Sequence, residues 1–264
     1  RRPGDGLFQM WYSTGSPTKK LALAYAESRD GLAWERPALD LVRYRRRGTN
    51  IVFDAEPHGA AVIYDPVDPR PGWVYKMMTG AAPSGRISVF RSADGIHWKP
   101  AAENPVIGTN PDCPISFARL PDGRFTAFHR PGFGDRRVGR TESWNFRDFS
   151  EAVVVVEPDA GDPPNTQFYG LGTAIYGAYW IGTLWVYHTD PDTRDFYKMT
   201  GYQQPEFVHA RSSTCWHRTA QGTPWIAVSP DPEQFDSGQI QPVSAPVFLD
   251  QEIRFYYTGT RQRH

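Results

Sequence analysis

The sequence predicts an all-β protein, and its composition, its turn signals and an internal repeat all support this prediction. Glycine and proline contribute 24 residues each to a chain of 264, and aromatic residues make up 14% of it. Such a composition favours short strands joined by frequent turns and is unfavourable for long helices. No segment keeps an apolar stripe at the helical period over about a dozen positions, which excludes helical solenoids.

The internal repeat is a short motif, Ser-x-Asp-Gly-x-x-Trp. It occurs as "SRDGLAWERP" from Ser28 and as "SADGIHWKP" from Ser92. An Asp-Gly pair between apolar runs indicates a tight turn, because glycine adopts positive φ without steric cost. Weaker copies start at Ser143 and Ser212, where the Asp-Gly pair is lost but an aromatic residue is kept. Each copy therefore marks the same point of a repeated unit.

Several strand-like segments lie around each copy of the motif. The third unit is the most complete, with "CPISFARL", "RFTAFHR", "RRVGRTES" and "EAVVVVE" in succession. The second unit offers "GAAVIYD", "WVYKMMTG" and "RISVFRS", and the fourth offers "FYGLGTAIY", "AYWIGTLWVYH" and "EFVHARSS". The last segment has only "QPVSAPVFLD" and "EIRFYYTG". Four-stranded units of about 50–70 residues, repeated along a chain, are typical of β-propeller blades.

We therefore expect an all-β, five-bladed β-propeller that forms a single domain over residues 1–264. The first and last blades should be incomplete, because the sequence starts in a turn and stops just after a strand, as if clipped at both ends. A β-sandwich with accidental repeats is the alternative, but it does not require the fixed order of strand, turn and aromatic residue. The blades are expected at approximately 1–47, 48–104, 105–160, 161–228 and 229–264.

The charge balance and the cysteines limit the possible partners and cofactors. The 29 basic and 29 acidic residues give a formal net charge of zero, which argues against a nucleic-acid partner. No apolar run is long enough for a membrane span. The two cysteines, Cys113 and Cys215, form no disulfide framework, and we expect buried free thiols. We expect no cofactor, although a single calcium ion held by scattered oxygens in the channel stays open as an alternative.

Candidate site residues lie where the first strand of each blade begins, because propellers place their chemistry at these points around the central channel. Converging carboxylates there would suit the cleavage of glycosidic bonds. Two arginines at strand ends of the third blade, Arg130 and Arg140, could orient carboxylates or bind a charged group, with structural ion pairs as the alternative. The polar residues that precede or open the first strands are Glu56 and His58, Asn110 and Asp112, Gln167 and Tyr169, and Asp236 and Gln239.

These motifs resemble those of the five-bladed-propeller glycoside hydrolases, families 32 and 43 and their uncharacterised relatives. "PDCP" at residues 111–114 is similar to a Glu-Cys-Pro motif whose acid is the general acid, which implies that role for Asp112. "AEPH" at residues 55–58 lies where the family has Arg-Asp-Pro, whose carboxylate stabilises the transition state, which implies that role for Glu56. The phrases "TNIV", "VIYDPVDP" and "YYTGTRQRH" are most similar to an uncharacterised bacterial branch.

The sequence departs from the family pattern in two respects. Both acids differ in length from the family's residues, Asp112 standing for a glutamate and Glu56 for an aspartate. The first-blade aspartate motif, which supplies the nucleophile or base, has no counterpart and would lie before Arg1.

The resemblance implies a glycosidase-like enzyme, a hydrolase or transglycosylase that acts on a small sugar or furanoside. The departures leave two alternatives open, because a fold alone does not decide function. One is a non-catalytic carbohydrate-binding propeller. The other is a lyase, isomerase or cyclase that reuses the funnel.

Overall fold

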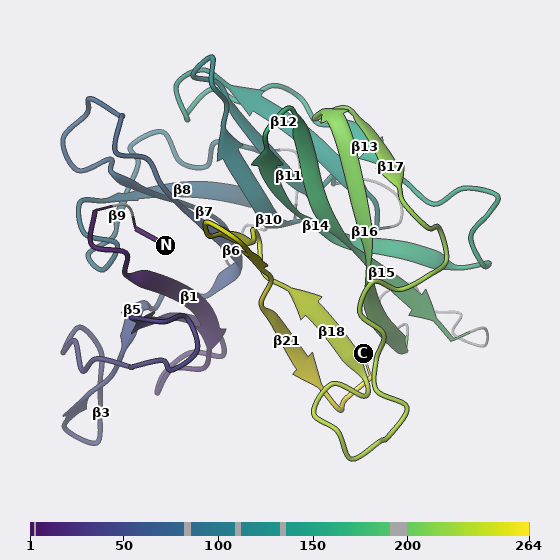
Figure 1. Ribbon diagram of the computed structural model, residues 1–264. Helices are drawn as coiled ribbons and strands as arrows, with labels where there is room; N and C mark the ends of the chain where they lie inside the picture. The colour runs from purple at the N-terminus through teal and green to yellow at the C-terminus, as the bar shows by residue number, and fades with distance from the viewer. Residues whose placement is uncertain (3, 82–85, 109–111, 133–135, 191–199, 264) are drawn as a thin grey trace. The chain divides into compact units, whose positions relative to one another are not determined.

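The computed structural model (Figure 1) confirms the all-β prediction. The described residues form 21 strands and no helix, so none of them forms a helix that could cross a membrane. The structure describes residues 1–2, 4–81, 86–108, 112–132, 136–190 and 200–263. Within these ranges, the side chains of residues 81 and 112–115 are not described.

The chain divides into two compact units. The first unit comprises Arg1–Pro114 and Trp144–Phe149, and the second comprises Ile115–Ser143 and Ser150–His264.

The first unit contains two antiparallel sheets that follow the order of the chain. One has the order β1-β2-β5 and the other the order β6-β7-β8-β9, and a small ribbon, β3-β4, accompanies them. Leu23, Tyr25, Val52 and Met77 form the buried centre of this unit. The strand bounds are β1 Phe8–Thr14, β2 Ala22–Ser28, β3 Arg43–Tyr44, β4 Arg47–Gly48, β5 Ile51–Phe53, β6 Pro57–Tyr64, β7 Tyr75–Ala81, β8 Arg86–Ser92 and β9 Lys99–Pro100.

The second unit continues the same up-and-down pattern. One sheet has the order β10-β11-β12-β13, and a larger sheet is built from β14, β15 and β16, with β17 paired to β16. The pair β18-β21 joins β16 through one parallel bridge, between Gln203 and Gln239. The strand bounds are β10 Asp112–Arg119, β11 Phe125–Arg130, β12 Val138–Ser143, β13 Val153–Val156, β14 Thr166–Tyr176, β15 Tyr179–Thr189, β16 Gly201–Ser212, β17 Cys215–Arg218, β18 Gln239–Pro242, β19 Val247–Phe248, β20 Ile253–Arg254 and β21 Tyr257–Thr260.

This succession of antiparallel sheets is a β-propeller arrangement. Three sets of four strands, β6 to β9, β10 to β13 and β14 to β17, correspond to the three complete blades expected from the sequence. The leading sheet and the pair β18-β21 are shorter, as expected. Among the described residues, four separate sheets have the form of a blade. The pair β18-β21 does not form a fifth, because it belongs to the same sheet as β14, β15 and β16. The fifth blade therefore stays a prediction.

The two Ser-x-Asp-Gly-x-x-Trp motifs form the same turn. The Ser28 hydroxyl donates to Asp30 Oδ1 at 2.9 Å and accepts a hydrogen bond from the Gly31 N–H at 2.8 Å. Ser92 and Asp94 make the matching contacts, each at 2.9 Å. The glycines of the two turns have φ of 75° and 80°, in the left-handed region that favours glycine. The repeat therefore extends to individual hydrogen bonds.

The third copy keeps this turn with different residues. Asn145 takes the place of the aspartate, and its Oδ1 accepts the N–H groups of Arg147 and Asp148 at 3.0 and 2.9 Å. Phe146 stands in the glycine position with φ of 58°. Its ring is fully buried and packs edge-on against Trp73, which offsets the backbone strain.

The fourth copy is a two-residue hairpin, in which Ser212 pairs with Cys215. Cys215 is a free and exposed cysteine, so the predicted buried thiol was wrong at this position. The reason is that β17 is the outer strand of its sheet, and alternate side chains of such a strand face solvent.

Candidate functional site

Strand β6 begins directly after Glu56, whose backbone lies in the left-handed region with φ of 51°. This conformation is uncommon for a residue other than glycine and costs about 1–3 kcal/mol. The Glu56 side chain is 35% exposed, and its Oε2 lies 3.7 Å from Lys19 Nζ. The carboxylate is thus accessible to a ligand from solvent and has one positive neighbour.

A β-bulge follows within the same strand. The register between β6 and β7 shifts between His58 and Ala60, and the intervening Gly59 has φ of 58°. Bulges bend a strand and re-aim its side chains, and they are frequent next to active sites. The exposed His58 therefore lies in a segment whose backbone departs from regular pairing.

Strand β10 begins at Asp112, so this residue opens a first strand as the sequence analysis expected. Asn110 lies outside the described residues, and the Asp112 side chain is likewise not described.

Strand β14 repeats the features of β6. Asn165, directly before it, has φ of 65°, and the register with β15 shifts between Phe168 and Gly170, at Tyr169. Gln167 is buried, and its Oε1 accepts a hydrogen bond from Arg136 Nη1 at 2.7 Å. A left-handed residue followed by a bulge thus occurs at the first strands of two blades.

Two guanidinium groups lie close to the ring of Tyr169. The Cζ atoms of Arg130 and Arg136 are 5.2 and 5.3 Å from the centre of its ring. Tyr187 meets Tyr169 edge-on at 6.1 Å, and burial raises the pKa of Tyr187. This group, the Tyr169 cluster, offers aromatic faces and planar cationic donors, which suit polar or anionic ligands.

The Tyr169 cluster brings together three of the predicted residues, Gln167, Tyr169 and Arg130. Arg136, which links them, was missed by the sequence analysis. It stands at the edge of the strand segment "RRVGRTES", where nothing in the sequence distinguishes it from Arg137.

Arg140 makes contacts that fit the structural alternative considered for it. Its guanidinium forms an ion pair with Glu142, and its Nε donates to Ser213 Oγ at 2.7 Å. Glu142 also pairs with Arg124 at 3.1 Å. None of these partners is among the predicted site residues.

The two candidates near β18 are also engaged in hydrogen bonds. Asp236 Oδ2 accepts the Tyr257 hydroxyl at 3.0 Å, and burial together with this carboxylate raises the pKa of Tyr257. Gln239 opens β18 and is buried, and its Nε2 donates to the Gln262 carbonyl at 2.9 Å. These contacts hold the start of β18 in place.

Comparison with known proteins shows the fold. No protein-family model matches the chain, and no curated protein matches it. A thermostable family-43 glycoside hydrolase is similar over 99% of this chain and 85% of its own, with a TM-score of 0.70 and 13% identity. A solved structure from Bacteroides ovatus that is described as a glycoside hydrolase is similar over 98% of this chain and 82% of its own, with a TM-score of 0.65 and 14% identity.

A third solved structure is a β-1,2-mannobiose phosphorylase from Listeria innocua in complex with β-1,2-mannobiose. It is similar over 94% of this chain and 67% of its own, with a TM-score of 0.61 and 13% identity. At such low identity the likeness concerns the fold. This chain has the fold of the β-propeller glycoside hydrolases.

Proposed function

We propose that this protein is a glycoside hydrolase or transglycosylase that acts on a small sugar or furanoside. Asp112 is the proton donor and Glu56 the carboxylate that stabilises the transition state. The main support is local: Glu56 is held in a strained conformation directly before β6, and Asp112 opens β10, the first strand of the next blade. Backbone strain of this kind is concentrated at functional sites.

The proposed chemistry needs only carboxylates and no cofactor. Asp112 gives its proton to the glycosidic oxygen as the bond to the anomeric carbon breaks. Glu56 opposes the positive charge that grows on the sugar ring. Water or a hydroxyl of a second sugar then adds to the anomeric carbon, and its proton passes to a carboxylate that acts as base, which is Asp112 itself in a retaining enzyme. A separation of about 5–5.5 Å between the proton donor and the carboxylate that acts as nucleophile or base would mean retention, and about 6.5–9.5 Å would mean inversion.

Further residues are proposed to bind the sugar. Tyr169 offers an aromatic face, and Gln167 and Arg130 offer hydrogen-bond donors next to it. Their substitution should raise KM more than it lowers kcat, because uniform binding affects KM. The other proposed sugar-binding residues are His58, Asn110, Asp236 and Gln239, whereas Arg140 is assigned the structural ion pair with Glu142 that was its alternative role.

The first test is turnover of aryl furanosides and pyranosides by the wild type, Asp112→Asn and Glu56→Gln. Loss of a proton donor typically costs about 10²–10⁴-fold in rate, so Asp112→Asn should lose most turnover and keep its sugar affinity. Glu157→Gln is the matched control, since Glu157 is an exposed acid that pairs with Arg137 on the surface. Inorganic phosphate is included as an acceptor because one similar structure is a phosphorylase.

The outcomes separate the alternatives. Unchanged turnover in Asp112→Asn would contradict its assignment as the acid. Sugar binding without turnover in every protein would favour the non-catalytic propeller. Loss of turnover on treatment with a chelator would contradict the proposed cofactor-free chemistry.

A further inference from the structure

A basic hairpin, made of the ribbon β3-β4 and the tip between its strands, stands beside a pocket in the first unit. Four of the five residues from Arg43 to Arg47 are arginines. The pocket has a volume of about 500 Å³, within the roughly 300–1,000 Å³ that is usual for small-molecule sites. It is lined by the turn after β1, by Tyr44 of the basic hairpin and by the segment Thr49–Ile51.

The tip of the basic hairpin consists of two arginines in a conformation that favours other residues. Tyr44 pairs with Arg47, so Arg45 and Arg46 form a two-residue loop, and their φ values are 47° and 66°. Positive φ at both central residues is the mark of a type I′ turn, for which asparagine followed by glycine is preferred. The turn itself therefore does not require arginines, and a ligand of their guanidinium groups explains them better.

Among the described residues, three positive charges of the basic hairpin have no acidic partner. Arg43 lies 3.3 Å from Asp40, whereas Arg45, Arg46 and Arg47 form no ion pair with any residue that the structure describes. All three are exposed. The whole chain has a formal net charge of zero, so this excess of positive charge is local. Such an excess attracts an anionic ligand.

These charges lie next to an exposed aromatic ring at the pocket. Tyr44 lines the pocket and is 50% exposed. The guanidinium of Arg45 lies 5.2 Å from the centre of the Tyr44 ring. Arg47 is directly opposite Tyr44 in the strand register, so the two side chains lie on the same face of the ribbon. An aromatic face for a sugar ring and guanidinium groups for an acidic substituent are thus close together.

One short turn connects this pocket with the surroundings of Glu56. Ser16 lines the pocket, and its Oγ accepts the N–H groups of Thr18 and Lys19 at 3.2 and 2.9 Å. Lys19 Nζ in turn lies 3.7 Å from Glu56 Oε2. The turn after β1 therefore forms part of the pocket wall and also contacts a proposed catalytic carboxylate.

We propose that this pocket is a subsite for an acidic sugar, so that the substrate is an oligosaccharide that carries a carboxylate or sulfate group. One sugar ring packs against Tyr44, and Arg45 and Arg47 bind its acidic group, while Arg46 adds to the local positive charge. Arginine suits both acids, because its planar guanidinium donates two parallel hydrogen bonds. The identification of the ligand as a sugar rests on the proposed function, whereas its negative charge follows from the basic hairpin alone.

The experiment measures the binding of sugars to the full chain by calorimetry at low and at physiological salt. The probes are trimers of galacturonic acid, of sulfated galactose and of neutral galactose. At least one acidic trimer should bind more tightly than the neutral trimer, with an affinity that falls as salt is added. Binding of only one acidic trimer would identify the acid as carboxylate or sulfate.

The main variant, Arg45→Asn/Arg46→Gly, removes two charges and keeps the turn, because it creates the preferred sequence of a type I′ turn. It should weaken the acidic trimer at least about tenfold, the loss that one charge-assisted hydrogen bond brings, and leave the neutral trimer unchanged. Arg47→Gln should act in the same direction. Tyr44→Ala should also weaken the acidic trimer, since it removes the aromatic face, but the salt dependence should stay as in the wild type.

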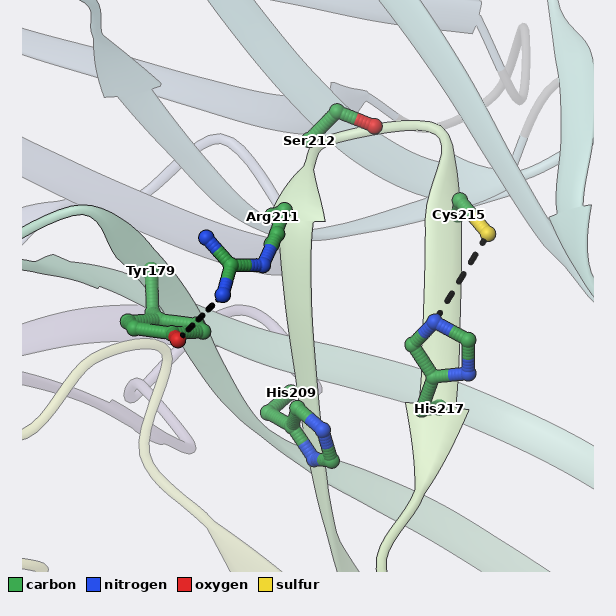
Figure 2. A pocket seen from close by; sticks show the side chains of 6 residues that line it. All are labelled: Tyr179, His209, Arg211, Ser212, Cys215 and His217. Atoms are coloured by element: carbon green, nitrogen blue, oxygen red, sulfur yellow. Dashed lines mark hydrogen bonds between the residues drawn. The ribbon is translucent and has the colours of Figure 1, made fainter.

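The control variant Arg29→Gln/Arg211→Gln also removes two exposed arginines and should bind all trimers as the wild type does. Arg211 is a counterpart of Arg45, because its guanidinium lies 4.8 Å from the centre of the Tyr179 ring. It lines another pocket, on β16 and β17 of the second unit (Figure 2). There its Nη2 donates to the Tyr179 hydroxyl at 2.8 Å, so this arginine is already engaged within the protein.

Four results would overturn the proposal. These are equal binding of acidic and neutral trimers, no binding of either acidic trimer, an equal loss of affinity in the control variant, and tighter binding of a single-stranded RNA of the same charge. The last result would assign the basic hairpin to nucleic acid. Because binding is measured without turnover, a lack of glycosidase activity would contradict the proposed function alone, and a lack of acidic-sugar binding in an active enzyme would contradict the subsite alone.

Discussion

His129 is a buried histidine whose environment favours the neutral imidazole. Only 2% of the residue is exposed, and its Nδ1 lies 2.9 Å from the Arg130 carbonyl oxygen. Burial lowers the pKa of His129, and the hydrogen bond to the Arg130 backbone opposes this in part. The unfolded chain has the ordinary histidine pKa of about 6.5. As the pH falls below that value, the unfolded state therefore binds more protons than the folded state does.

The free energy of unfolding should therefore rise with pH in the window below about 6.5. The contribution of His129 is present above the unfolded pKa and is lost as the pH falls toward the folded one. Between neutral pH and a pH of about 5, the free energy of unfolding measured in urea should fall less in His129→Gln than in the wild type. His217→Gln is the exposed control. An identical pH dependence in the wild type and His129→Gln would contradict the prediction.

Single residues also show what the sequence could reveal about the candidate site. The position of Gln167 and Tyr169 near the start of a strand was predictable, because the apolar run after them is a local signal. The left-handed conformation of Glu56 and the bulge at Gly59 were not, because both are backbone choices set by strand pairing. Arg136 was missed for a similar reason, since its partner Gln167 is 31 residues away.

Among the elements, the Ser-x-Asp-Gly turn is the one that the sequence described best, since the hydrogen bonds that close it are local. Burial alone would raise the pKa of Asp94, but hydrogen bonds, first from the His97 backbone, hold it well below its usual range. Asp94 Oδ1 accepts the N–H groups of Ile96 and His97 at 2.9 and 2.8 Å. The side chain thus satisfies two backbone donors of the turn.

Asp94→Ala should lower the free energy of unfolding by about 1–2 kcal/mol, because it removes these acceptors. Asp94→Asn should cost much less, since Asn145 accepts the equivalent N–H groups in the third copy of the turn. Urea unfolding at neutral pH measures both values. If the asparagine variant were as unstable as the alanine variant, the charge of Asp94 and not its hydrogen-bond geometry would stabilise the turn.

Strand lengths were predicted well within the complete blades and poorly near the end of the chain. "RISVFRS" coincides with β8, because no proline or glycine interrupts the segment. The expected strand over residues 241–250 is split instead into the end of β18 and the short β19. Pro242 and Pro246 interrupt it, since proline has no N–H for the strand ladder.

At the scale of the whole chain, the turn of one blade docks on the preceding blade. In the first unit, Trp11 Nε1 donates to the Gly95 carbonyl at 2.8 Å, and Arg70 Nη1 donates to the Asn145 carbonyl at 3.2 Å. The second contact explains why Trp144–Phe149 groups with the first unit. The sequence showed the repeat but not these contacts, because they join residues 84 and 75 positions apart.

Hydrogen exchange should reveal a gradient of local stability along the chain. Strand β15 is paired with β14 on one side and with β16 on the other, and Leu184, Val186 and Tyr187 within it are fully buried. Opening this strand requires the loss of two ladders and of core packing, so its free energy of opening should approach that of global unfolding.

The ribbon β3-β4 is the opposite case. It pairs only two residues on each side, and Arg45 and Arg46 at its tip have positive φ. We expect its amides to exchange at nearly the rate of an unfolded chain, together with those of the equally short β19-β20 in the second unit, while β15 exchanges last. Mass spectrometry of peptides over residues 43–48, 181–187 and 247–254 provides the measurement. Slow exchange of both ribbons would mean that contacts other than strand pairing hold them, and fast exchange of β15 would contradict its place at the centre of the second unit.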